Sequence, residues 1–360
     1  MTQRRTFLTA TAGTGLLAAS GLAIGQAPVK AGFVYVSPIG DAGWTFQHDT
    51  GRKQMEQALA GKVQTQFIES VKEGPDAERV IRELAQSGHQ VIFATSFGYM
   101  NYMERVAKQF PKTAFIHATG YKMGPNMGIY NARFYEGRYL TGVVAGSMSR
   151  SNVLGYVAAF PIPEVLQGIN AFTRGARSVN PKAEVRVIWV NSWYDPGKEG
   201  DAANTLLSQG ADVVTHHTDS TAVVQAAEKA GKYAIGYHSD MSKYGAKAHL
   251  TAATHHWGEY YIRTMNEIIA GNWKPTSVWG GHKEGMVKLA PINPAVPAEV
   301  RSAVAKLEAG IAGGSFHPFT GPVIDQDGKE RVAAGKVMSD DDLGKMDYYV
   351  EGVASRLPKK

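Results

Sequence analysis

The sequence of 360 residues contains no cysteine. This absence excludes disulfide-bonded scaffolds, thiolate zinc sites, iron–sulfur clusters and cysteine nucleophiles. It also excludes lipid attachment through an N-terminal cysteine, because there is no thiol to acylate. We therefore expect a protein that is not lipid-anchored.

Charge is scarce as well. Charged residues make up 19% of the chain and hydrophobic residues 44%, a composition typical of a globular rather than a disordered protein. The formal charge is +6, and Arg4 and Arg5 supply two of these charges within residues 1–27, which hold no acid. The remaining +4 is spread along the chain without a basic run. We therefore expect no nucleic-acid partner.

A long, strongly hydrophobic run is also missing. No charged side chain lies between Arg5 and Lys30, but four glycines and four threonines dilute this stretch, whereas a spanning helix needs about 20 apolar residues. A basic start, an apolar middle and a small-residue end are typical of a secretory signal, and residues 2–8 (TQRRTFL) resemble a twin-arginine signal. We expect residues 1–27 to be an export signal cleaved near Ala27, which predicts a soluble periplasmic protein. An uncleaved membrane anchor is the alternative.

The rest of the chain alternates short β-branched apolar runs with amphipathic stretches. Strands alternating with helices of about 12 residues predict parallel, doubly wound α/β sheets. In the first unit we expect strands at residues 31–36, 63–70, 89–95 and 113–117, and helices at 44–59, 75–86, 100–109 and 136–148. In the second unit we expect strands at 153–158, 185–190, 212–215 and 233–237, and helices at 163–179, 201–209 and 221–230.

Two similar units with several crossings predict a hinged clamshell whose ligand lies in the cleft between the lobes. We expect the chain to cross near residues 150–152, 248–254 and 280–283. Lobe 1 is then predicted to comprise residues 28–150 and 250–280, lobe 2 residues 151–249 and 281–335, and a C-terminal segment residues 336–360. A hairpin is expected at residues 321–332, with Asp327 and Gly328 at its turn.

Signatures of catalysis are absent from the sequence. The chain has no GxxxxGK[ST] loop, HExxH helix or GxSxG elbow. The adjacent histidines at 216–217 and 255–256 would point their rings apart on a strand or helix, so neither pair predicts a metal site. Carboxylates such as Asp219 and Asp240 cannot be brought together from sequence alone. We expect a protein that is not an enzyme and needs no cofactor or metal.

Polar and aromatic residues gather in the loops that follow the predicted strands. Trp44 follows the first strand, Ser96 and Phe97 follow the third, and Phe160 and Trp193 follow the first two strands of the second unit. Because the carboxyl ends of parallel strands open into the cleft, Trp44 and Trp193 are expected to clamp a flat ring from opposite lobes. For Trp44 alone, a place in the core at the start of its helix is an equal alternative.

Residues 40–45 (GDAGWT) resemble the D-x-S-F-N loop of the basic-membrane-protein (BMP) family of ABC-transporter substrate-binding proteins, which includes purine-nucleoside receptors. The resemblance implies a type I periplasmic-binding-protein fold, with two doubly wound parallel-sheet lobes joined by a multi-crossing hinge. It further implies a monomer that binds a purine-type ligand and delivers it to an ABC permease in the inner membrane. Other matches to the family lie at residues 134–146, 162–175, 192–196, 210–213 and 347–355.

The resemblance also implies roles for individual residues. The aromatic side chains that stack on the base in the family correspond to Trp44 and Trp193. Asp41 corresponds to the loop aspartate of the family, and Lys283 lies near its late ligand-facing lysine. We therefore expect these four residues to contact the ligand, together with the strand-end residues named above.

One departure from the family bears on the ligand. Where the family has G-V-D-x-D, this chain reads GYHSD, so His238 replaces the first aspartate and Asp240 keeps the second. That first aspartate resembles the ribose-hydroxyl acceptor of nucleoside receptors, and a neutral imidazole offers one acceptor instead of a carboxylate. We expect His238 and Asp240 at the site, and a free purine base, adenine above all, as the ligand. The alternatives are a purine nucleoside, a secreted nucleoside-processing enzyme, a transcription-regulator sensor, and another flat or sugar-like ligand.

Overall fold

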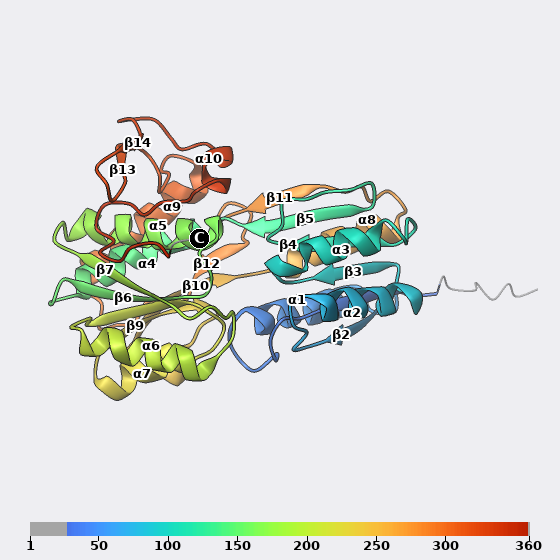
Figure 1. Cartoon of the computed structure of the whole chain (residues 1–360), viewed down its shortest axis with the longest axis horizontal. Helices are drawn as coiled ribbons and strands as arrows, with labels where there is room; N and C mark the ends of the chain where they lie inside the picture. The colour runs from blue at the N-terminus through green and yellow to red at the C-terminus, as the bar shows by residue number, and fades with distance from the viewer. Residues whose placement is uncertain (1–26, 359–360) are drawn as a thin grey trace, which may run out of the picture.

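The structure is a computed structural model that describes residues 27–358. The predicted export signal, up to residue 26, lies outside the described residues. The described chain folds into two α/β lobes set end to end, with the C-terminal elements stacked on the second lobe (Figure 1). The expected two-lobed architecture with parallel sheets is therefore confirmed.

Lobe 1 is built on a six-stranded sheet in the order β11-β5-β4-β3-β1-β2, and every neighbouring pair is parallel. Helices α1 and α8 cover one face of this sheet, and α2 and α3 cover the other. Strands β3 and β4 are buried at every position, as expected for parallel strands covered on both faces. The elements are β1 (Val29–Val34), α1 (Trp44–Ala58), β2 (Val63–Ile68), α2 (Pro75–Gln86), β3 (Val91–Ala94), α3 (Met100–Ala107), β4 (Ala114–Ala118), β5 (Met127–Ala132), α8 (Gly258–Ile269) and β11 (Ser277–Gly280).

Lobe 2 repeats the plan with the order β12-β10-β9-β8-β6-β7, in which β12 alone runs antiparallel to its neighbour. Helices α4, α5 and α9 cover one face, and α6 and α7 cover the other. The elements are α4 (Phe134–Met148), β6 (Val153–Ala158), α5 (Pro163–Val179), β7 (Glu184–Trp189), α6 (Pro196–Ser208), β8 (Val213–His217), α7 (Ala222–Ala230), β9 (Tyr233–His238), β10 (His249–His255), β12 (Val287–Leu289) and α9 (Ala298–Gly313).

Helices α4 and α5 approach each other closely because glycines face the contact. A Cβ atom on Gly142 would lie 2.1 Å from the carbonyl oxygen of Phe172, and one on Gly175 would lie 2.1 Å from that of Tyr139. Any larger residue at either position would push the helices apart. Helix α4 is accordingly buried along nearly its whole length, from Phe134 to Gly146.

The chain crosses between the lobes three times, and two of these crossings differ from the expectation. They follow β5, β10 and β11, where the chain enters α4, α8 and β12. The crossing after β11 agrees with the expected join at 280–283, but the first lies at residue 133 rather than 150–152. Backbone hydrogen bonds hold the crossings together, since Arg133 N donates to Gly280 O (2.7 Å) and His256 N donates to Met286 O (3.0 Å).

The predicted lobe boundaries change with these crossings. Helix α4, expected in lobe 1, packs against α5 in lobe 2, where apolar residues such as Leu140 and Val144 join the core of that lobe. Strand β10, which falls within the range 250–280 expected in lobe 1, pairs with β9 in lobe 2. Its sequence, HLTAATH, lacks the run of large β-branched residues that marked the other strands, although all seven positions are buried.

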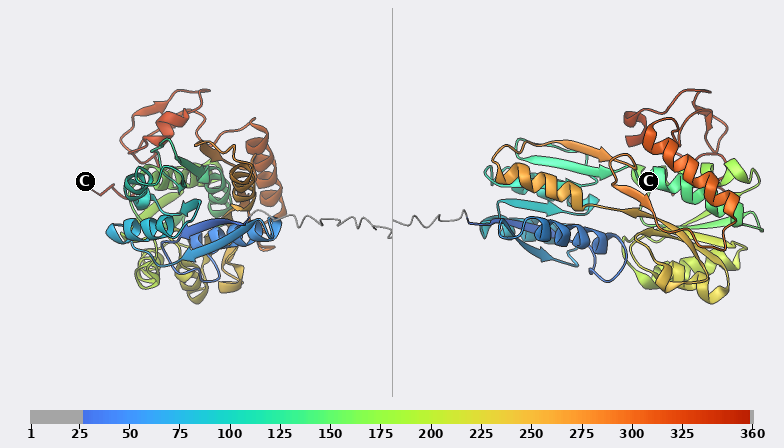
Figure 2. Two further views of the ribbon diagram at one scale, coloured as in Figure 1. Left: turned by 90° about the vertical axis from the view of Figure 1, so that its right-hand side faces the viewer. Right: turned by 180° about the vertical axis from the view of Figure 1, so that it is seen from behind.

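The C-terminal residues form a small unit on lobe 2 (Figure 2). It contains the antiparallel pair β13 (Val323–Ile324) and β14 (Glu330–Val332), which confirms the predicted hairpin, and the short helix α10 (Asp340–Gly344). Gln167 and Asn170 of α5 bind it by donating to Leu343 O and Tyr348 O, both at 2.8 Å. Of the helices described within residues 27–358, none is long and apolar enough to cross a membrane.

Candidate functional site

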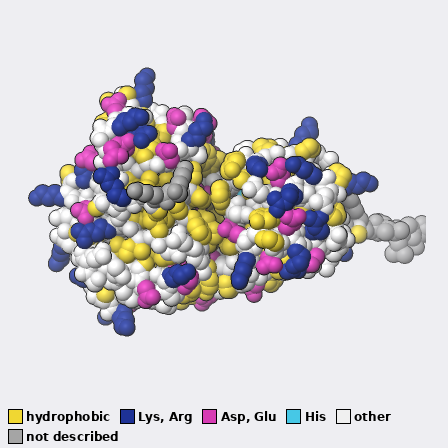
Figure 3. Space-filling view, viewed as in Figure 1, with side chains coloured by type: hydrophobic (Ala, Val, Ile, Leu, Met, Phe, Trp, Pro, Cys, Tyr) yellow, Lys and Arg dark blue, Asp and Glu magenta, His cyan; other side chains and the backbone are white. Residues whose placement is uncertain are grey.

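A pocket that is partly open to solvent lies between the two lobes. Its lining comes almost entirely from residues at or just after the carboxyl ends of strands, together with the first turns of α1 and α5. This is the place where open parallel sheets bind their ligands. The lining residues are Val36, Trp44, Ser96, Phe97 and Thr119 of lobe 1 and Glu164, Trp193, His217, Thr218, Asp219 and His238 of lobe 2. We call this pocket the slot. Hydrophobic side chains gather along the seam between the lobes on the face shown in Figure 3.

Five of the nine ligand-contacting residues predicted from the sequence line the slot, namely Trp44, Ser96, Phe97, Trp193 and His238. Phe160 lies behind them, with its ring 5.0 Å from that of Trp193 in an edge-on arrangement. The loops after β3, β6, β7 and β9 therefore meet at the same cleft.

The other three predicted residues lie outside the slot. Asp41 is exposed at the rim, where it pairs with Lys243 (2.7 Å) and accepts a hydrogen bond from Tyr244 on the opposite lobe. Asp240 accepts from Ser242 N (2.9 Å) at the surface. Lys283 is exposed in the turn that follows β11. Asp41 therefore joins the two lobes by polar contacts at the rim. Neither Asp240 nor Lys283 lines the slot.

Trp44 is both a core residue and a lining residue. Its side chain is 9% exposed and belongs to the hydrophobic core of lobe 1, and its Nε1 donates to Thr95 O (2.7 Å). The backbone turns sharply before it at Gly43, whose φ is +100°, and a Cβ atom there would lie 2.3 Å from Asp219. The two alternatives for Trp44 therefore coexist, since this core indole also lines the slot.

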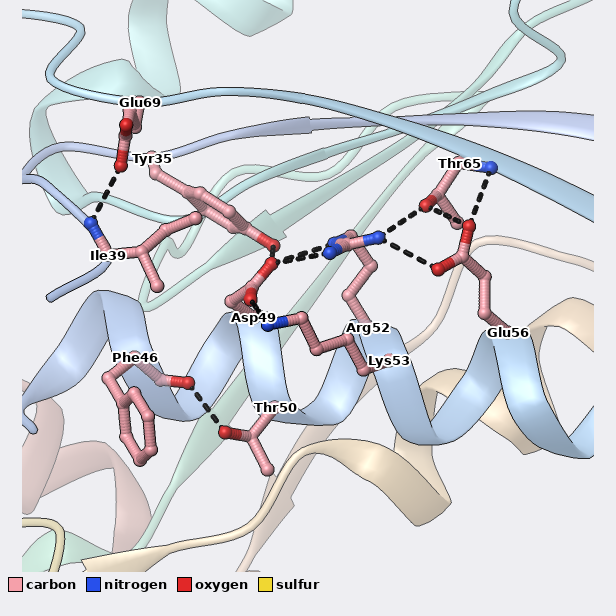
Figure 4. Close-up of polar contacts among 10 residues, drawn as sticks. All are labelled: Tyr35, Ile39, Phe46, Asp49, Thr50, Arg52, Lys53, Glu56, Thr65 and Glu69. Atoms are coloured by element: carbon pink, nitrogen blue, oxygen red, sulfur yellow. Dashed lines mark hydrogen bonds and ion pairs between the residues drawn. The ribbon is translucent and has the colours of Figure 1, made fainter. Parts of the chain in front are cut away.

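A network of polar contacts fixes helix α1 and thereby Trp44 at its start (Figure 4). The buried Asp49 carboxylate accepts from Arg52 Nε (2.8 Å) and pairs with Lys53 (2.8 Å). Arg52 continues the network to Glu56 (2.9 Å) and to the hydroxyl of Thr65 on β2 (2.6 Å). The helix is thus tied to the edge of its sheet by several bonds at once.

Trp193 reaches the slot from the other lobe. It follows β7, and its Nε1 donates to Glu73 Oε1 of lobe 1 (3.1 Å). The same carboxyl oxygen accepts from Ser96 Oγ (2.5 Å) and Gly98 N (2.7 Å). Trp193 is partly buried, and it lines the slot on the side of the lobe opposite to Trp44.

Asp219 is a lining residue that the sequence reasoning did not assign. It follows β8 and accepts hydrogen bonds from Ser37 Oγ and from Trp44 N of lobe 1. Burial raises the pKa of this carboxyl to about 7, although those two donors act in the opposite direction. The carboxyl thus joins the lobes directly beside Trp44. Its place just past a predicted strand is the signal that would have found it.

Glu164 is a second lining residue missed from the sequence. It lies in the first turn of α5, one residue after the Pro163 that starts the helix. Its Oε2 accepts from Asn131 Nδ2 of lobe 1 (3.1 Å), and its Oε1 lies 3.7 Å from His217 Nε2. Burial raises the pKa of Glu164 to about 8. The family match at residues 162–175 includes this position, but the resemblance implies no role for the acid.

The histidines of the slot are neutral. Burial holds the pKa of His217 and of His238 well below the ordinary histidine value, and the buried cation Arg138 lowers both further. His238 Nδ1 is hydrogen-bonded to His255 Nδ1 (3.0 Å), so one of these two rings donates and the other accepts. With its acids shifted upward and its histidines shifted downward, the slot suits an uncharged ligand.

Two lining residues have a left-handed backbone. Thr119 has φ +62° after β4, and His238 has φ +66° at the end of β9. Such conformations are costly for residues other than glycine and tend to cluster at ligand sites. Among residues 27–358, no three His, Asp or Glu side chains are grouped so that they could hold a metal ion.

Comparisons with known proteins show what this chain is similar to. The family described as "ABC transporter substrate-binding protein PnrA-like" (Bmp) matches residues 28–313. A purine-binding protein of Brucella abortus is 50% identical over 339 residues, covering 94% of this chain and 97% of its own. A putative ABC transporter glucose-binding protein of Haloferax volcanii is 39% identical over 330 residues, covering 92% and 81%. Among solved structures, an ABC transporter solute-binding protein of Aeropyrum pernix aligns with a TM-score of 0.70 at 16% identity, covering 88% of this chain and 96% of its own.

Proposed function

The chain belongs to the Bmp family of ABC transporter substrate-binding proteins, and from this premise we propose that it captures a purine-type ligand, adenine above all, between Trp44 and Trp193. The family resemblance read from the sequence is confirmed by the match over residues 28–313. The ligand, the stacking and the roles of single residues are the proposal.

The observation that carries the proposal is the slot itself. Indoles from opposite lobes line it, and the neutral histidines and raised acid pKa values favour an uncharged aromatic ring. Offset stacking contributes on the order of 1 kcal/mol per ring beyond burial. The relative that is 50% identical is named as a purine-binding protein, which supports the same class of ligand.

The preference for a free base over a nucleoside rests on His238. Its Nδ1 is already bonded to His255, so a ribose would meet one imidazole nitrogen where a carboxylate could accept from two vicinal hydroxyls. Asp240 and Lys283 lie outside the slot and do not replace that acceptor. A purine nucleoside is the second candidate. A nucleoside-processing enzyme is disfavoured, because the chain belongs to a family of substrate-binding proteins.

We further propose that the mature protein is a periplasmic monomer that delivers its ligand to an ABC permease. Family membership supports the permease as partner. Export rests on the signal predicted at residues 1–27.

Titration calorimetry of the purified protein tests the ligand, with adenine, adenosine, guanosine, inosine and glucose as separate titrants. We expect adenine to bind most tightly. Tighter binding of any of the three nucleosides would overturn the free-base version. Binding of glucose without any purine would overturn the purine proposal and match the relative from Haloferax volcanii.

A further inference from the structure

We propose that Glu164 determines the specificity of the slot by accepting, as a carboxylate, an N–H group of the bound ring. This inference rests on the proposed function and deepens it. It names the chemical feature that the ligand must carry, which is a neutral heteroaromatic ring with an N–H donor at its edge.

The orientation of the Glu164 carboxyl group is fixed from one side. Asn131 Oδ1 accepts from the backbone N–H of Ala132 (2.8 Å), which turns the amide so that Nδ2 donates to Glu164 Oε2 (3.1 Å). Because an amide nitrogen can only donate, Oε2 is held as an acceptor by a residue of the opposite lobe. The side chain is 13% exposed, so the group is buried but open to the slot.

The second oxygen is the one available to a ligand. Glu164 Oε1 lies 3.7 Å from His217 Nε2, which is beyond hydrogen-bond distance. Both residues line the slot. The acceptor Glu164 Oε1 and the ring nitrogen His217 Nε2 are therefore neighbours in its lining. Purines present a matching edge, in which an N–H donor is adjacent to an acceptor atom.

Other ionisable side chains lie in or next to the slot. Arg138 of α4 is fully buried below the slot, with its guanidinium 3.3 Å from the ring centroid of Tyr237 on β9. His217 of β8 and His238 of β9 are neutral for the reasons given above, and burial keeps the pKa of Tyr237 well above its ordinary value. Asp219 is the other acid that lines the slot, and it accepts from the backbone N–H of Trp44.

These features predict a coupling between binding and proton release. The free Glu164 carboxyl has a raised pKa of about 8, so below that pH it is largely protonated and must lose its proton to accept from the ring. The affinity should therefore rise about tenfold per pH unit up to pH 8 and level off above it. Replacement by glutamine removes the proton and the charge but keeps the shape.

The test compares adenine binding by the wild type and by Glu164→Gln from pH 6 to pH 9. We expect the ratio of their affinities to rise towards pH 8 and then become constant. Calorimetry in buffers of different ionisation enthalpy should show that, below pH 8, the wild type releases about one proton more on binding than Glu164→Gln does. Asp219 is present in both proteins, so its contribution cancels in the ratio. Glu164→Asp, which keeps the carboxyl group, should bind more weakly and retain the pH slope.

A constant ratio, or one that falls with rising pH, would overturn the inference, because a structural glutamate or a protonated donor would give those results. Purine lacks the exocyclic amino group of adenine, and 9-methyladenine lacks its ring N–H. A wild-type preference for adenine over either compound that disappears in Glu164→Gln supports the inference, whereas equal preferences in both proteins overturn it. Failure of the wild type to bind adenine at any pH would instead overturn the proposed function.

Discussion

Trp193 and Trp44 differ in how much of each ring is buried against other side chains of the protein. Trp44 contacts the rings of His48, Phe134, Trp257 and His238 and is almost fully buried. Trp193 is partly buried and packs mainly on Phe160. Truncating Trp44 would open a cavity in lobe 1 and destabilise the fold. A loss of affinity in that variant could not be separated from a loss of stability. Trp193 is therefore the better probe of stacking.

We expect Trp193→Ala to weaken adenine binding by about 1–3 kcal/mol, which is the usual range for loss of a stacking side chain. The measurement is titration calorimetry at one pH, with the melting temperature as a check on folding. Tyr194→Ala is the matched control, because this neighbour is 39% exposed and does not line the slot. Unchanged affinity in Trp193→Ala would reject the clamp.

At this scale the sequence predicted best the residues that directly follow strands with a clear apolar pattern. Ser96 and Trp193 were found in this way. Asp219 follows β8, which ends in two histidines, so the apolar pattern did not mark the end of this strand. Glu164 lies at the start of a helix rather than at the end of a strand. Asp41 was placed by resemblance alone, and its partners Lys243 and Tyr244 come from a contact between lobes that no local pattern contains.

Helix α1 shows how an element positions a single side chain. Its polar face carries Asp49 and Arg52, both nearly fully buried, and these join the helix to Thr65 of β2. A buried ion pair contributes little compared with a packed apolar pair, but removing one partner leaves an unpaired charge and is strongly destabilising. The network therefore makes the start of α1 sensitive to a change two turns away.

We expect Arg52→Ala to lower the free energy of unfolding by about 3 kcal/mol, because it removes the main partner of the buried Asp49 carboxylate. Lys53→Ala removes the exposed partner of the same carboxylate and should cost less than about 1 kcal/mol. Urea denaturation of the two variants and the wild type makes the comparison. Equal losses in both variants would contradict the role assigned to Arg52.

Most helices and strands could be predicted from the spacing of apolar residues in the sequence. The predicted bounds of α2, β6 and α5 agree with those observed. Strand β5 was missed, and β10 was read as a join. Both contain polar or small residues at buried positions, as in MGIYNA and HLTAATH, so their burial comes from neighbouring elements rather than from their own hydrophobicity. Lobe assignment depends on such tertiary contacts, which explains why α4 and β10 were assigned to the wrong lobe.

On the scale of the whole molecule, the two lobes are joined across the cleft by several polar contacts. Gly43 N donates to Ser239 Oγ (2.8 Å), and Gln47 Nε2 donates to His238 O (3.0 Å). Asp219 contributes two further buried contacts, with Ser37 and Trp44. The lobes are therefore in contact across the cleft in this structure, and separating them would return Asp219 to water.

We expect closure to depend on pH through Asp219. An exposed aspartate has a pKa of about 3.9, whereas burial raises that of Asp219 to about 7. The closed form thus binds an extra proton between these values, so closure is favoured as pH falls from 7 towards 4 and weakens as pH rises to 7.

Small-angle X-ray scattering of the ligand-free protein measures this effect. The radius of gyration of the wild type should increase from pH 5 to pH 8, whereas that of Asp219→Asn should change less. An identical pH dependence in the two proteins would show that other groups control closure.

The direction of β1 has a practical consequence. Because its carboxyl end faces the slot, its amino end at Val29 lies at the far tip of lobe 1, as far from the cleft as the lobe allows (Figure 1). A solid support or a fluorescent fusion partner attached at Ala27 would leave the moving faces of both lobes unobstructed. With a dye on the exposed Tyr194 position, the same molecule could be made into an immobilised optical sensor for its ligand.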